Sequence, residues 1–192
     1  MSAATPNGAR TIWTRVGRTD GRARALADKH YSRKHIGAAE FCPPGNNIVL
    51  LHLVDEFTAD ALWVSHRPDP SAGLARPRFD GFDYWDNPFF RNESELIASE
   101  MIREAIAISL HYWWRNVPRD GFHSFVDPKQ VKPVMRHSQA VYGWCFDKAG
   151  FDLSPQKTAD KKLLRYILPR ERLIWIEPLK PQFSQQHLFE VA

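Results

Sequence analysis

The chain of 192 residues has few of the features that mark membrane, secreted or thiolate-metal proteins. No apolar run approaches the ~20 residues that a membrane span needs, so we expect no membrane partner. The segment MSAATPNGARTIW has no hydrophobic stretch after a basic one, and we therefore expect no secretory signal. Cys42 and Cys145 are the only cysteines and form no C-x-x-C pattern. They predict free thiols in a reducing cytoplasm rather than a disulfide framework or a zinc site.

The chain also has no internal repeat and no low-complexity segment. Its apolar share of 43% and its charged share of 25% are ordinary for a globular protein. A chain of this length can bury a hydrophobic core as one unit, so we predict a single domain over residues 1–192. The oligomeric state is not indicated by any pattern.

Acidic residues are scarce in two stretches of the chain, whose net charge is +4. The first contains Arg10, Arg15, Arg18, Arg22, Arg24, Lys29, Arg33 and Lys34 against Asp20 and Asp28. The second is a basic C-terminal extension from about residue 157, with Lys157, Lys161, Lys162, Arg165, Arg170 and Arg172. Such stretches are either solvated faces or the binding surface of a polyanion, namely nucleic acid or a phosphate-bearing cofactor. For a DNA partner we predict phosphate contacts from Arg22, Arg24, Arg33 and Lys34.

The hydrophobic pattern predicts alternating strands and helices. The predicted strands cover residues 11–18, 48–54, 60–67, 87–92 and 121–127, a last strand within 156–168, and an edge strand at 171–178. The predicted helices cover residues 20–30 with Asp20 as N-cap, 94–114 with Ser94 as N-cap, and 138–150 closed by Gly150. This order predicts an α/β domain with a mixed central sheet flanked by helices.

A long aromatic insertion loop rich in Pro and Gly is predicted at about residues 69–88. Long loops inside compact domains are often functional. Its aromatic residues are Phe79, Phe82, Tyr84 and Trp85. They either stack on the bases of a nucleic acid or pin the loop to the domain.

The second half of the chain resembles the GNAT fold of acyl-CoA-dependent N-acyltransferases. The resemblance consists of a strand ending at Asn92, a long helix, a strand ending at Asp127, and a helix with the ending CFDKAGF. It implies that the N-terminus of the long helix holds the phosphates of CoA. In this chain the corresponding groups are Arg91, Asn92 and Ser94. The glycine-containing loop of the family is replaced here by FRNESELIAS, whose glutamates would repel a phosphate, so acyl-CoA is an uncertain cofactor.

Four short motifs in order resemble the Mom family of bacteriophage DNA-modification proteins. They are HYS, FFRNE, FVDP and CFDKAGF, and the resemblance covers roughly residues 25–151. It implies a GNAT-like enzyme that places a carbamoylmethyl group on N6 of adenine in double-stranded DNA and so protects phage DNA from restriction. The protein would then act in the cytoplasm of the host cell. Because the group is joined through a CH₂, plain transfer of an acyl group does not account for the product.

The same resemblance implies that His30, Tyr31 and Asp127 support activity and bind iron. Imidazole, phenolate and carboxylate are reasonable iron ligands. Without a metal, His30 is a candidate general base and Tyr31 a proton donor. The alternatives are structural, because a histidine at a helix end often caps it, a tyrosine often packs, and Asp-Pro often starts a turn. Two other functions stay open: a conventional GNAT N-acyltransferase using acetyl-CoA on a small amine or a protein, and a non-catalytic DNA-binding protein.

Overall fold

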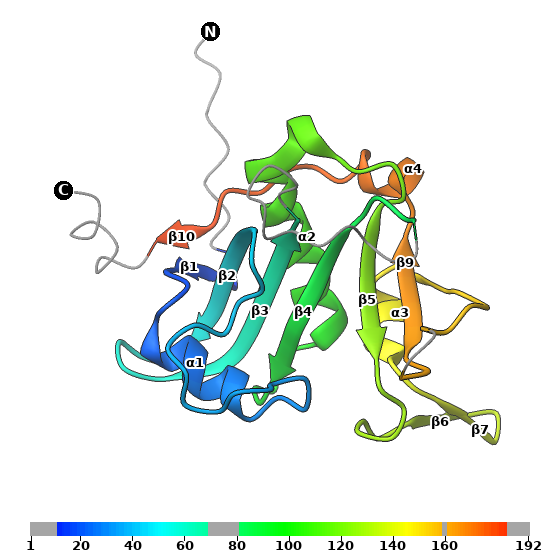
Figure 1. Ribbon diagram of the computed structural model, residues 1–192, viewed down its shortest axis with the longest axis horizontal. Helices are drawn as coiled ribbons and strands as arrows, with labels where there is room; N and C mark the ends of the chain where they lie inside the picture. The colour runs from blue at the N-terminus through cyan, green and yellow to red at the C-terminus, as the bar shows by residue number, and fades with distance from the viewer. Residues whose placement is uncertain (1–10, 69–80, 159–160, 184–192) are drawn as a thin grey trace, which may run out of the picture.

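The structure is a computed structural model that describes residues 11–68, 81–158 and 161–183. Its centre is a mixed eight-stranded sheet in the order β10-β1-β2-β3-β4-β5-β9-β8 (Figure 1). The strands are β1 Thr14–Val16, β2 Asn46–Leu53, β3 Ala59–Arg67, β4 Trp85–Asn92, β5 Phe122–Val126, β8 Asp152–Leu153, β9 Leu164–Leu168 and β10 Gln182–Phe183. A separate pair, β6 Val134–Arg136 and β7 Gln139–Val141, forms a second sheet. The α/β class and the mixed sheet that the sequence predicts are therefore confirmed.

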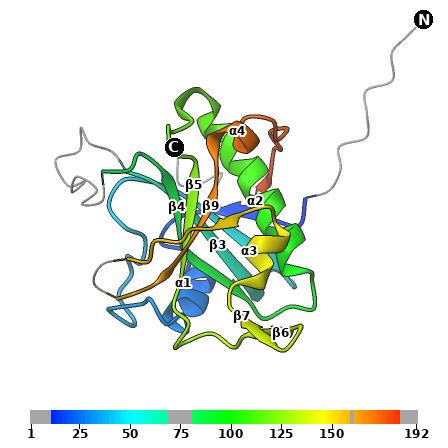
Figure 2. The same ribbon diagram turned by 90° about the vertical axis from the view of Figure 1, so that its right-hand side faces the viewer.

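Helices cover both faces of the sheet (Figures 1 and 2). They are α1 Gly21–Asp28, α2 Ala98–Trp113, α3 Trp144–Lys148 and α4 Arg170–Leu173, with a 3₁₀ turn η2 at Trp114–Asn116. Alternation along β2 divides the core, since successive side chains of a strand point to opposite faces. Val49 and Leu51 pack with α1, whereas Ile48 and Leu50 pack in the larger cluster that contains α2 and α3. None of the helices in the described ranges is long and apolar enough to cross a membrane.

The β4–β5 pair is parallel and opens partway along its length. Its register runs from Trp85 opposite Phe122 to Asn87 opposite Ser124 and then stops. The pairing ends where β4 is irregular: the β3–β4 register shifts between Val64 and His66, at the position of Asn87 and Pro88. Beyond this point β4 stays paired with β3 and β5 with β9, so the two strands separate without leaving the sheet.

Several predicted boundaries agree with the structure. Asp20 is the N-cap of α1, and its carboxylate accepts hydrogen bonds from the amides of Arg22 and Ala23. β4 ends at Asn92, and β5 ends one residue before Asp127. Gly150 follows α3 with a φ of 97°, the left-handed conformation that closes many helices.

Four predictions of local structure are wrong. Ser94 does not cap α2, which begins four residues later, because Asn92 holds Ser94 and Leu96 in a turn of side-chain hydrogen bonds. The helix predicted at 138–150 is a hairpin strand followed by the five-residue α3. The edge strand predicted at 171–178 is instead α4 and a coil, and the edge is formed by β10. The insertion loop predicted at 69–88 is shorter, because β4 starts at Trp85; residues 69–80 lie outside the described residues.

Candidate functional site

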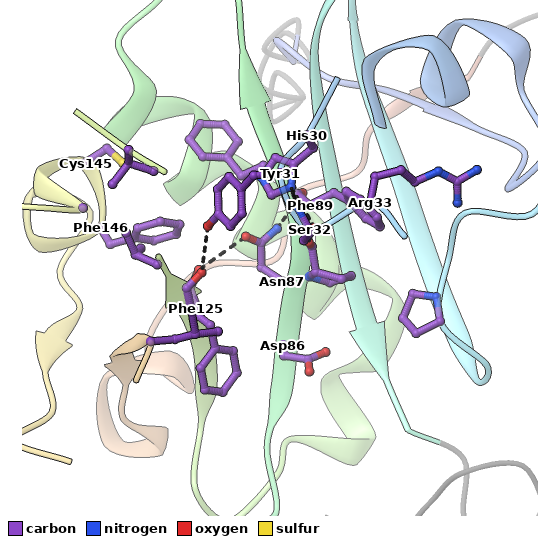
Figure 3. Close-up of a pocket in the computed structure, with 18 of the residues that line it drawn as sticks. His30, Tyr31, Ser32, Arg33, Asp86, Asn87, Phe89, Phe125, Cys145 and Phe146 are labelled. Carbon is purple, nitrogen blue, oxygen red and sulfur yellow. Dashed lines mark hydrogen bonds between the residues drawn. The ribbon is translucent and has the colours of Figure 1, made fainter. Parts of the chain in front are cut away.

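A cleft of about 970 Å³ lies over the place where β4 and β5 separate. The loop after α1, the strands β4 and β5, the root of the β6–β7 hairpin and the start of α3 form its walls (Figure 3). Its aromatic lining consists of Tyr31, Phe41, Phe89, Phe90, Phe125, Trp144 and Phe146, and its basic residues are Arg33, Lys34 and Lys132. An apolar cleft with a few convergent polar groups is the usual form of a small-molecule site.

His30 and Tyr31 lie together at the strand separation. Their rings stack with centroids 4.4 Å apart, and the His30 ring also meets the edge of Phe89. The Tyr31 hydroxyl donates to the carbonyl of Phe125 (3.3 Å) and accepts from the amide of Asp127 (3.4 Å). These two backbone groups, one in β5 and one just after it, face the gap left by β4. The structure therefore brings Tyr31 and Asp127 together, although they are 96 positions apart.

Ser32 ties the same segment to β4. Its hydroxyl lies 3.2 Å from the carbonyl of Pro88 and 2.8 Å from Nδ1 of His30, and its single proton can be donated to only one of these two acceptors at a time. The Ser32 amide also donates to Nδ1, so this nitrogen carries the lone pair and the proton of the neutral ring is on Nε2. The HYS tripeptide thus spans the gap, because Ser32 contacts β4 and Tyr31 contacts β5. Sequence reasoning did not single out Ser32.

His30 is a neutral imidazole at neutral pH. Burial, assisted by the positive charge of Arg91, lowers its pKa from 6.5 to about 4, and a backbone hydrogen bond with Phe90 opposes the shift. Burial raises the pKa of Tyr31, and the negative charge of Asp127 acts in the same direction. At neutral pH the pair is therefore an unprotonated imidazole beside a protonated phenol. One can accept a proton and the other can donate one.

The lowered pKa of His30 predicts a pH dependence of stability. Between about pH 7 and about pH 5 the unfolded chain binds a proton at His30 and the native state does not, so acidification favours unfolding. We expect the free energy of unfolding of the wild type to fall by up to about 2 kcal/mol more than that of a His30→Asn variant over this window. Urea denaturation of both proteins at the two pH values measures the difference. Parallel curves for the two proteins would contradict the shift.

The three predicted iron ligands already have protein partners. Nδ1 of His30 accepts from Ser32, the Tyr31 hydroxyl donates to Phe125, and the Asp127 carboxylate accepts from the amide of Lys129. Across residues 11–68, 81–158 and 161–183, no group of three or more His, Cys, Asp or Glu side chains is placed to hold a metal ion. Iron bound by these three residues therefore stays a prediction; in this conformation the protein itself holds each of them.

A second histidine pair borders the cleft and was missed by sequence reasoning. Nδ1 of His66 lies 2.7 Å from the carboxylate of Asp86, and Nε2 lies 2.9 Å from the carbonyl of Pro44. Asp86 is one of the residues that line the cleft. Only the β3–β4 register, which sets His66 opposite Asp86, reveals the pair.

The residues predicted to bind DNA phosphates have different surroundings. Arg22 pairs with Asp20 and donates to the carbonyl of Glu56. Arg33 pairs with Asp28 and donates to the carbonyls of Ala38 and Glu40; its side chain is 5% exposed. Both guanidinium groups thus stabilise the α1 segment rather than face solvent. Arg24 is half-buried and acts on the charge of Asp28, whereas Lys34 is exposed and lines the cleft.

The predicted phosphate-binding residues before α2 bind one another. Arg91 pairs with Glu93 and donates to the carbonyl of Lys29, and Lys29 also pairs with Glu93. Asn92 accepts from Ser94 and donates to the carbonyl of Leu96. The α2 N-terminus therefore lies behind a closed turn that carries a carboxylate. This arrangement disfavours a CoA pyrophosphate at that position.

The aromatic residues of the insertion pack in the protein. Trp85 is 1% exposed and meets Trp113 edge to face, and Tyr84 is buried and stacks on His123. Phe82 lies under the guanidinium of Arg165. These contacts favour the structural alternative for all three residues, and Phe79 lies outside the described residues.

The two thiols of the cleft are protonated. Burial raises the pKa of Cys42 to about 12 and that of Cys145 to about 11. Neither is a nucleophile at neutral pH.

Comparisons of the chain with protein-family models, curated proteins and solved structures found no match. The described residues define an α/β protein with a mixed sheet, in which an aromatic cleft opens over a parallel strand pair that separates. Any function assigned to it rests on the chemistry of this cleft.

Proposed function

We propose that the chain is an enzyme that modifies the exocyclic amine of adenine in DNA. The observation that carries the proposal is the stacked His30–Tyr31 pair inside an aromatic cleft of about 970 Å³. A base in a duplex must leave the stack to be modified, and enzymes hold such bases between aromatic and apolar side chains. The resemblance of the HYS, FFRNE, FVDP and CFDKAGF motifs to the Mom family supports the same substrate.

The amine of adenine is a weak nucleophile, because its lone pair is delocalised into the ring. Bond formation between N6 and a carbon of the donor makes its N–H acidic, and one proton must leave. Even a weakly basic imidazole accepts such a proton. We assign this role to neutral His30: the Ser32 hydroxyl, 2.8 Å from Nδ1, passes its own proton to that nitrogen while its oxygen takes the proton from N6. The phenol of Tyr31 is the matching donor to the leaving group.

Mass analysis of nucleosides tests the proposal. DNA from cells that express the chain is digested and compared with DNA from cells that carry the empty vector. We expect a new deoxyadenosine species of higher mass, whose mass gives the added group. Unchanged nucleosides, both in the cells and with purified protein supplied with a cell extract as donor source, would reject it.

The separation of β4 and β5 favours a second candidate, an N-acyltransferase of the GNAT type. A parallel strand pair that opens leaves backbone groups for an extended ligand such as the arm of acyl-CoA. In this chain Tyr31 already binds the backbone groups of Phe125 and Asp127, and Glu93 lies before α2. Thermal unfolding with saturating acetyl-CoA separates the candidates, because a ligand of the native state raises the melting temperature. A clear rise would place the acyltransferase first.

A further inference from the structure

The β6–β7 hairpin extends from the body of the protein (Figures 1 and 2). Its strands pair only with each other, from Val134 opposite Val141 to Arg136 opposite Gln139. Nearly all of its residues are exposed, Met135 by 61%. At the tip His137 and Ser138 have φ values of 46° and 64°, the left-handed pair of a tight two-residue turn. A two-stranded hairpin that buries so few of its residues contributes little to the stability of the fold, which favours a role in binding.

The hairpin segment is basic throughout. No acidic residue occurs between Asp127 and Asp147, while Lys129, Lys132 and Arg136 lie in that interval. All three are exposed, in contrast to the ion-paired and half-buried Arg22 and Arg33. Exposed cations without neighbouring acidic residues are typical of a binding surface for a polyanion. The ion-paired arginines of the first basic stretch do not form such a surface.

The root of the hairpin is also a wall of the cleft. Lys132, Val134 and Val141 line the cleft, as does Trp144. The guanidinium of Arg136 lies 4.4 Å from the centre of the Trp144 ring, and the ammonium of Lys148 lies 4.5 Å from it. A polymer bound on the hairpin would therefore pass the mouth of the cleft that holds His30 and Tyr31.

The dimensions of the hairpin match one groove of DNA. Two paired strands are roughly 4.8 Å apart, and three residues of strand rise about 10 Å. The major groove of B-DNA is about 12 Å wide and about 8.5 Å deep and admits a two-stranded ribbon. We infer that the β6–β7 hairpin enters the major groove of duplex DNA, with Lys132 and Arg136 on flanking phosphates and His137 and Ser138 at the base edges. The inference deepens the proposed function and rests on it.

Variants that remove positive charge from the hairpin, compared with a matched control, test this placement. Lys132→Gln/Arg136→Gln removes two hairpin cations. The control, Arg115→Gln/Lys180→Gln, removes two cations that lie elsewhere. Like Arg136, Arg115 lies over a tryptophan, the exposed Trp114, but it precedes β5. Lys180 precedes β10, at an edge of the sheet. Affinity for a 20-base-pair duplex is measured over a salt series. Each phosphate contact makes the negative slope of log K against log salt steeper by about 0.9. We therefore expect the hairpin pair to make the slope about 2 less steep and the control pair to leave it unchanged.

Two further measurements separate groove entry from simple charge. His137→Asn/Ser138→Gly keeps the turn with its preferred residues but removes the tip side chains, and we expect it to weaken duplex binding without lowering the melting temperature. Duplex RNA of the same length has a major groove too narrow for the hairpin, so this tip variant should not change RNA binding. Equal losses on DNA and RNA would overturn groove entry, as would tip variants that bind like the wild type.

The outcomes also distinguish the inference from the proposed function. If the wild type shows no salt-dependent DNA binding and no modified nucleoside, the proposed function fails. If the wild type modifies adenine and binds the duplex but the hairpin and control pairs have the same slope, only the placement of DNA on the hairpin fails.

Discussion

A Tyr31→Phe variant is expected to lose at least about 100-fold of the adenine-modifying activity while it keeps the fold, since removal of a general acid typically costs about 10²–10⁴ in rate. The phenyl ring can keep the stacking with His30, and only the hydroxyl disappears. That hydroxyl is protonated at neutral pH, as in an ordinary tyrosine, and burial raises its pKa further. Its two hydrogen bonds, to the backbone of Phe125 and Asp127, are long, at 3.3 and 3.4 Å, so their loss should cost about 1 kcal/mol of stability.

The amount of modified deoxyadenosine, measured by mass analysis at matched expression, checks this prediction. Thermal unfolding of the purified variant shows whether the fold is kept. Cys42→Ala is a suitable control at the same cleft, because the protonated Cys42 thiol has no assigned role. A Tyr31→Phe variant that forms the adduct at the wild-type level would show that Tyr31 only closes the gap between β4 and β5.

The strand pattern could be predicted from the sequence because burial repeats along it. Alternation and apolar runs indicated β2, β3, β4 and β5 to within a few residues, and Asp20 was recognisable as a cap. The hairpin could not be predicted, because its turn uses His137 and Ser138 instead of the usual Asn-Gly. The start of α2 was misplaced because Ser94 looks like a cap, and only the side chain of Asn92 reveals the competing turn.

The candidate site was predictable only in part. The resemblance indicated His30, Tyr31 and Asp127, and the structure places Tyr31 against the backbone of Asp127. The bridging role of Ser32 depends on the end of strand pairing at Pro88, which involves residues distant in sequence. The basic residues illustrate the same limit: composition gives the number of cations, but only packing shows that Arg33 is used internally and that Arg136 is exposed.

The geometry of the site depends on where β5 begins, and Gly121 determines that point. Its φ is 78°, and its carbonyl accepts the amide of Trp85, which aligns β4 with β5. A Cβ at this position would lie 2.2 Å from the carbonyl oxygen of Leu168 and 2.9 Å from the amide nitrogen of Arg170. Both atoms belong to backbone next to the β5–β9 ladder, so neither can move without breaking strand pairing.

Gly121→Ala is therefore expected to be the most destabilising of the substitutions considered. The left-handed conformation alone costs an alanine roughly 1–2 kcal/mol, and the overlap with backbone should bring the total to at least about 3 kcal/mol. Gly37→Ala is the matched control: φ is 81° there, and no atom lies within 4 Å of the added Cβ. Thermal unfolding should show a fall of roughly 6–12 °C for Gly121→Ala and about one third to two thirds of that for Gly37→Ala. Equal losses would mean that β9 yields to the added methyl group, and that the alignment of β4 with β5 is not fixed at Gly121.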